Sequence, residues 1–191
     1  MASAIEGKVK RSLFYTFLNI GTKDNPKWAR EGKNVSELTI NMNPQTTTAQ
    51  DITQDTADTE VTGYQPSTAF SKHVDITDPI HPYINNIRRR RKVLSDAHSQ
   101  ILNVEVFDKN EDGSYPAELQ DVSIQVDTVG GAAADPFTLA YGYNYRGDAK
   151  LGKVTITNGE IKFTEDSETA DISFLASGSN PVPAPASGKS S

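Results

Sequence analysis

The stretch TDPIHPYINNIRRRRKVL, from Thr77 to Leu94, is where the sequence changes its period. Its apolar side chains recur at helical spacing and form one stripe, made of Ile80, Tyr83, Ile84, Ile87 and Leu94. Asp78 is a favourable N-cap, and Pro79 suits the first position of a helix. The pattern therefore predicts one α-helix over residues 78–94.

On both sides of this helix the sequence is typical of β-strands. Short apolar or alternating runs separated by turn residues predict strands at 12–21, 35–43, 61–64, 69–76, 101–107, 117–127, 137–145, 153–157 and 160–164. Asn158-Gly159 is a strong signal for a two-residue hairpin turn. We therefore expect a mainly β fold, a β-sandwich or barrel with one flanking α-helix.

The composition indicates one domain that is not self-sufficient. A chain of 191 residues can bury one sizeable core, yet only 36% of it is hydrophobic and its mean hydropathy is −0.53. We expect a β domain over residues 1–175 and a flexible tail rich in Pro, Ser and Gly over 176–191. The N-terminus lacks an apolar signal segment and no long apolar run follows, so we expect no membrane partner.

The segment PQTTTAQDITQDTADTE, residues 44–60, has almost no apolar side chains and cannot form a core element alone. Its threonines favour extended structure, so we expect a long extended arm loop that becomes ordered against a neighbour. Deleting this arm should leave the rest of the chain folded. The residues that we predict to contact another subunit are Pro44, Gln45, Thr46, Thr47, Thr48, Asp51 and Ile52.

Charge is segregated along a chain whose net charge is −6. Acidic residues dominate 37–81 and 105–127, and between these segments lies the cationic run Arg88, Arg89, Arg90, Arg91 and Lys92. Consecutive helical residues point about 100° apart, so these cations fan around the helix. Three interpretations stay open: a solvated helix end whose cations favour the dipole, pairing with carboxylates, and direct contact with DNA. We expect the run to contact carboxylates of another subunit.

No pattern in the sequence indicates catalysis or a metal site. His73, His81 and His98 are the only imidazoles, and none lies in a ligand or nucleophile motif. The segment 108–119 resembles a calcium loop, but its twelfth position is Leu119 instead of glutamate. The chain has no cysteine, which excludes disulfides and thiolate ligands. We expect no enzyme activity, no catalytic or metal-binding residue and no cofactor.

The order of the segments resembles a known family. Residues 27–55 (KWAREGKNVSELTINMNPQTTTAQDITQD) are followed by GYQPSTAF, DPIHPYINNIRRRRK, ILNVEVFD and ADPFTLAYGYNYRGDAKLGKVTI. Over about residues 8–165 this succession resembles tail tube proteins, the major tail proteins of long-tailed, siphovirus-type bacteriophages. The likeness rests on the character and order of segments and involves no catalytic motif.

The resemblance implies a structural subunit that forms hexameric rings, which stack into a hollow tube that conducts DNA from capsid to host. It also implies the partners: further copies of the chain, a tape-measure protein, tail-tip and tail-terminator proteins, and DNA that passes through the lumen without specific binding. The location would be the virion tail, assembled in the host cytoplasm. Two alternatives are a tube protein of a contractile or type VI-like injection system, and a DNA-binding module acting through Arg88–Arg91.

Overall fold

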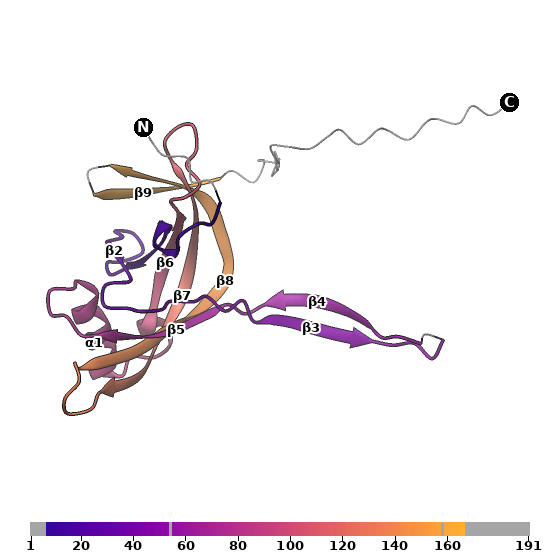
Figure 1. Ribbon diagram of the computed structural model, residues 1–191, viewed down its shortest axis with the longest axis horizontal. Coiled ribbons are helices and arrows are strands. Elements are labelled where there is room, and N and C mark those ends of the chain that lie inside the picture. Colours follow the sequence, from indigo (N-terminus) through magenta and orange to yellow (C-terminus); the bar gives the residue numbers. More distant parts are fainter. Residues whose placement is uncertain (1–6, 54, 158, 167–191) are drawn as a thin grey trace.

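A computed structural model describes residues 7–166 except 54 and 158, so the expected tail at 176–191 lies outside the described residues. The fold is mainly β with one α-helix, as expected (Figure 1). The strands are β1 (Phe14–Asn19), β2 (Trp28–Arg30), β3 (Pro44–Ala49), β4 (Asp58–Tyr64), β5 (Ser67–His73), β6 (His98–Glu105), β7 (Tyr115–Gly130), β8 (Thr138–Thr157) and β9 (Glu160–Glu165). The helix is α1 (Ile80–Arg90), and the 3-10 turns are η1 (Arg11–Leu13) and η2 (Leu94–Ala97).

Seven strands form one antiparallel, strongly curved sheet that is nearly closed like a barrel. Its order is β2-β1-β6-β7-β8-β5, and β9 pairs with the second half of β8. The segment 31–41 spans the gap between the two edge strands β2 and β5. It contacts β5 through isolated bridges that join Val35 to Lys72 and Asn41 to Ser67. It contacts β1 where the N–H of Glu31 donates to the carbonyl of Thr16 at 2.8 Å.

Both faces of the sheet bury apolar side chains, because residues along a strand alternate between faces. One cluster lies under α1 and includes Leu18, Ile101, Val122, Tyr141 and Tyr143 together with the helix residues. The second cluster lies on the opposite face, where the end of β8 and β9 fold over it; it contains Phe17, Leu102, Val104, Ala117 and Val154. The long strand β8 contributes to both clusters and thereby connects the barrel to the hairpin formed by the end of β8 and β9.

Helix α1 packs through Ile80, Ile84 and Ile87 of the expected stripe, which are all buried, whereas Leu94 lies beyond the helix and is exposed. At its start, the N–H of Ile80 donates to Oδ1 of Asp78 at 2.9 Å, so Asp78 caps the helix as expected. The helix ends earlier than predicted, because Arg91 adopts a left-handed conformation with φ of 48°. The chain turns away there, so the helix stops short of residue 94.

One strand prediction was wrong, and two predicted strands are parts of a single longer one. Residues 35–43 alternate in polarity but form only the isolated bridges at Val35 and Asn41, so they contact β5 without pairing along it. Residues 137–145 and 153–157 belong to one strand, β8, which continues through the polar residues between them because β7 pairs with it on both sides of Gly147. The predicted strands at 12–21, 69–76, 101–107 and 160–164 correspond to β1, β5, β6 and β9.

Candidate assembly interface

The Thr-rich arm is a hairpin in which β3 pairs with β4, so it is not an unpaired loop and it extends to Tyr64. The arm, Pro44–Tyr64, projects from the barrel (Figure 1). Its backbone bonds are made within the hairpin, and Thr48 and Thr59 face each other with hydroxyl oxygens 3.1 Å apart. With about 3.3 Å per residue, six paired residues carry the arm roughly 20 Å from its base. The sequence missed the pairing because no two-residue turn signal joins the strands.

A polar anchor fixes the base of the arm to β5. The side chain of Asn43 donates to the carbonyl of Gln65 at 3.0 Å and to the hydroxyl of Ser67 at 2.9 Å. The N–H of Asn41 donates to the carbonyl of Ser67 at 2.8 Å. These bonds hold both strands of the hairpin where they leave the sheet, so the arm has a defined direction relative to the barrel.

The arm presents acidic and apolar side chains but no cation. It carries Asp51, Asp55, Asp58 and Glu60, and no Lys or Arg. Asp58 and Glu60 lie two residues apart on β4 and therefore share one face of the hairpin. At the tip, Ile52 is fully exposed, with a relative exposure of 106%. Ile52 therefore contributes nothing to the core of the subunit.

The cationic run lies at the end of α1. Arg88 donates from Nε and Nη2 to Oδ1 of Asn85, at 3.0 and 2.8 Å. Arg89, Arg90 and Arg91 are exposed. Within residues 7–166, apart from 54 and 158, no carboxylate forms an ion pair with any of the five cations. Arg88–Arg90 occupy the last helical turn, where positive charge favours the helix dipole.

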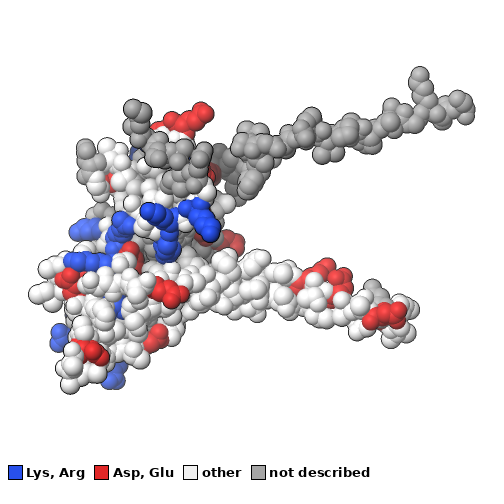
Figure 2. Space-filling view, viewed as in Figure 1, with Lys and Arg blue, Asp and Glu red and all other residues white. Residues whose placement is uncertain are grey.

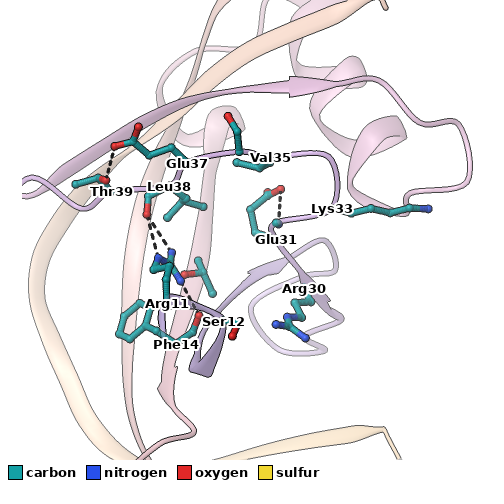
Figure 3. A pocket seen from close by; sticks show the side chains of 13 residues that line it. Arg11, Ser12, Phe14, Arg30, Glu31, Lys33, Val35, Glu37, Leu38 and Thr39 are labelled. Atoms are coloured by element: carbon teal, nitrogen blue, oxygen red, sulfur yellow. Dashed lines mark hydrogen bonds between the residues drawn. The ribbon is translucent and has the colours of Figure 1, made fainter. Parts of the chain in front are cut away.

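A groove of about 670 Å³ lies between β1 and the segment that crosses the gap in the sheet (Figure 3). It exists because β2 pairs only with Phe17–Asn19, so the first half of β1 has no strand beside it on this edge. Val35 and Leu38 line one wall and Phe14 the other, and Arg11 lies between them. The groove thus combines apolar side chains with charges of both signs, because Arg30, Lys33, Glu31 and Glu37 line it as well.

The two arginines of the groove are fixed by neutral groups. Arg11 donates from Nη1 to the carbonyl of Phe14 at 2.7 Å and from Nη2 to that of Leu38 at 3.0 Å. The guanidinium of Arg30 stacks on the ring of Tyr15, 3.6 Å from its centroid. In the described part of the chain neither arginine pairs with a carboxylate. Both charges are held in place without being neutralised.

Charge is distributed unevenly over the subunit. Figure 2 shows Lys and Arg gathered over the barrel near β2, whereas the charged side chains visible on the projecting arm are all Asp or Glu. Figure 1 places the arm tip on the opposite side of the subunit from β2. Sequence analysis noted the acidic segments and the cationic run but missed the groove. The available signal was the excess of Lys and Arg in residues 8–33.

A buried polar cluster holds the wall of the groove to the barrel. Nζ of Lys72 lies 2.7 Å from Oε1 of Glu31, and these side chains are 6% and 0% exposed. Lys72 also contacts Oδ2 of Asp78, an ion pair poorly aligned for a hydrogen bond. The hydroxyls of Tyr141 and Tyr143 donate to Oε2 of Glu31 at 2.9 and 2.7 Å. The cluster thus joins β2, β5, β8 and the start of α1.

Burial raises the pKa of the Tyr143 and Tyr141 hydroxyls well above the ordinary value, and the carboxylate of Glu31 raises it further. Both tyrosines are therefore neutral hydrogen-bond donors at neutral pH. This cluster was not predicted from the sequence, since its five members come from distant segments. Its role is to fix the segment 31–41, which forms one wall of the groove and leads into the arm.

Within the described residues no group of three or more His, Cys, Asp or Glu side chains could hold a metal ion. In the segment that resembles a calcium loop, Asp112 accepts hydrogen bonds from Ser114 and forms an ion pair with Lys153 at 2.8 Å. Those contacts hold the pKa of the Asp112 carboxyl well below its usual range. No helix of the described chain is long and apolar enough to cross a membrane.

Comparison with protein-family models gives no match, and comparison with curated proteins gives none either. Among solved structures the fold resembles a chain of the anti-feeding prophage baseplate, determined with six-fold symmetry, with a TM-score of 0.44 and 11% identity over 76% of this chain and 95% of that one. It also resembles a chain of the sheath-tube complex of an extracellular contractile injection system in its extended state. That match has a TM-score of 0.45 and 10% identity over 78% of this chain and 93% of that one.

The first of these chains comes from a baseplate and the second from a sheath-tube complex. At this low identity and similarity the two structures do not define the role of this chain. The functional conclusion therefore depends on its own surfaces.

Proposed function

We propose that this chain is a structural subunit that assembles head to tail with copies of itself into a tail-like tube. The observation that carries the proposal is the arm, a hairpin that projects from the barrel, carries four carboxylates and no cation, and exposes Ile52 at its tip. Cations gather on the other side of the subunit (Figure 2). Complementary surfaces on opposite sides of a subunit favour a head-to-tail contact. Such a contact produces a closed ring when the rotation from one subunit to the next divides a full turn evenly.

In this proposal the subunits form hexameric rings that stack, and the role is structural and not enzymatic. The particle is a virion tail or a tail-like injection apparatus, assembled in the host cytoplasm. The sequence resemblance does not distinguish a contractile from a non-contractile tail, so the proposal covers both the siphovirus tube and the tube of a contractile or type VI-like injection system. The net charge of −6 supports a lumen that repels DNA and lets it slide. Tape-measure, tail-tip and tail-terminator proteins are the proposed further partners.

Electron microscopy of the concentrated protein in negative stain tests the proposal, and we expect hollow tubes or rings. Deleting residues 46–55 should leave a folded monomer, because every residue of β3 is exposed, and should abolish the assemblies. A matched control deletes residues 132–134, which are exposed in the turn between β7 and β8. Tubes from the arm deletion, or a wild-type chain that stays monomeric with tail-tip proteins present, would contradict the proposal.

The DNA-binding alternative has one observation in its favour, the exposed and unpaired Arg89, Arg90 and Arg91 in the described part of the chain. Binding through phosphate neutralisation would produce a gel shift that weakens steeply with salt. We expect no such shift, because acidic segments flank the run on both sides in the sequence. A shift at low salt that disappears when the three arginines are replaced by alanine would favour a DNA-binding module.

A further inference from the structure

We infer that the tip of the arm docks into the groove of a second copy, with Ile52 between Val35 and Leu38 and the arm carboxylates against Arg11 and Arg30. The inference rests on the proposed self-assembly and specifies its contact surface. It replaces the expectation that the cationic run receives the acidic surface. The contact would be repeated from copy to copy, since each subunit has one arm and one groove.

The first argument is apolar complementarity. Ile52 is fully exposed at the end of a hairpin, where none of the described residues of its own subunit covers it. The groove offers Val35, Leu38 and Phe14 as an apolar lining that the subunit leaves partly exposed. Its volume of about 670 Å³ exceeds that of one isoleucine side chain, so the neighbouring tip residues fit as well. Burial of both surfaces stabilises the contact.

The second argument is charge. Arg11 and Arg30 are oriented by backbone carbonyls and an aromatic ring, and within the described residues neither has a carboxylate partner. Asp55 and Asp58 likewise form no ion pair in that part of the chain. Arginine forks suit bidentate carboxylate partners, and a guanidinium that is already oriented loses less freedom on pairing. The groove also has two carboxylates of its own, but Glu31 is paired with Lys72 and Glu37 accepts a hydrogen bond from Thr39 at 3.1 Å, so the arm supplies the carboxylates that the two arginines lack.

The third argument is geometry. The arm points away from β2, which borders the groove, so an arm cannot reach the groove of its own subunit (Figure 1). Arm and groove therefore meet only between copies, as a head-to-tail contact requires. The cationic run is the competing surface. Its depression, lined by Pro82, Asn85, Asn86, Arg89 and Arg90, has no large apolar side chain to receive Ile52.

Disulfide cross-linking tests this contact in the full chain, which has no cysteine of its own. Ile52→Cys is paired by mixing with Ser36→Cys, an exposed position on the groove wall, under mild oxidation. The control mixes Ile52→Cys with Asn86→Cys, an exposed position beside the cationic run. All three positions are exposed, so folding should not be disturbed. We expect a cross-linked dimer on non-reducing gels from the first mixture and not from the control.

A charge exchange gives an independent readout. Arg11→Glu should weaken self-association measured by sedimentation, and mixing it with Asp55→Lys should restore assembly through the reversed pair. Ile52→Asp should weaken assembly roughly tenfold or more, because the apolar contact is lost. Cross-linking to Asn86→Cys instead of Ser36→Cys, or normal assembly of Ile52→Asp and Arg11→Glu, would overturn the docking while leaving self-assembly intact. A wild-type chain that never self-associates would instead overturn the proposed function.

Discussion

Replacing Lys72 by methionine would leave the carboxylates of Glu31 and Asp78 buried without their cation. Methionine preserves most of the aliphatic stem of lysine, so the change removes the charge with little loss of packing. The hydroxyls of Tyr141 and Tyr143 would still donate to Glu31, but they carry no positive charge. We therefore expect the fold to persist and its free energy of unfolding to fall strongly.

The magnitude follows from burial. Removing one partner of a buried ion pair typically costs about 3–5 kcal/mol, because the remaining charge is uncompensated in a low dielectric. For a chain of this length that corresponds to a melting temperature lower by roughly 6–20 °C. Lys150 provides a matched control: its Nζ lies 2.7 Å from Glu165, the same separation as Lys72 from Glu31, but its side chain is 56% exposed. Lys150→Met should cost about 1 kcal/mol or less.

Urea denaturation followed by circular dichroism, at a concentration where the chain is monomeric, measures both losses. A second variant, Lys72→Met with Glu31→Gln, removes one uncompensated charge. This double variant should be more stable than Lys72→Met alone. If the two changes acted independently, the loss caused by Glu31→Gln would add to that of Lys72→Met and the double variant would be less stable. If Lys72→Met and Lys150→Met lose the same amount, the reasoning is refuted, because burial would then make no difference to the ion pair.

Further outcomes are expected at other positions. Burial, and then repulsion from Glu105, raises the pKa of Glu118, so this group stabilises the fold less as pH rises; Glu118→Gln should raise the melting temperature at pH 8 and leave it almost unchanged at pH 4. Gly142→Ala should lower the stability to urea by about 1–3 kcal/mol, because the added Cβ would meet the backbone of Thr68 on β5; a neutral effect would show that β5 and β8 can separate there. Arg90→Gln should reduce the melting temperature only slightly, since it removes one exposed cation from the last turn of α1.

Much of the fold could be predicted from local patterns. The stripe of Ile80, Ile84 and Ile87 identified α1, and Asp78 marked its start. The helix ends where Arg91 takes a left-handed conformation. A glycine at this position would have predicted that end from the sequence, whereas an arginine does not. Strands that bury one face could be predicted because apolar and polar side chains alternate along them, with the apolar ones on the buried face. The segment 35–43 alternates as well, but only a partner strand could have made it a strand.

The candidate interface was predictable only in part. The polarity of the arm indicated correctly that it lies outside the core, since all six residues of β3 are exposed. The groove arises from the short pairing of β2 with β1, which depends on where the sheet stops. The buried Lys72 follows Thr68 and Phe70 at alternate positions of β5, so these three side chains share the buried face of the strand. A lone lysine gives no sign of the carboxylates and tyrosines that compensate it, because these come from residues far along the chain.

The arm has a consequence for when polymers can form. Two strands without a third, and without a shared apolar face, are only marginally stable in water. A free subunit therefore spends part of its time with the hairpin unzipped, and amide exchange should be faster there than in β6 or β7. Each encounter with an existing end would select the zipped form. Newly synthesised subunits then remain unassembled, and they polymerise only where an existing ring or tail tip presents several grooves together.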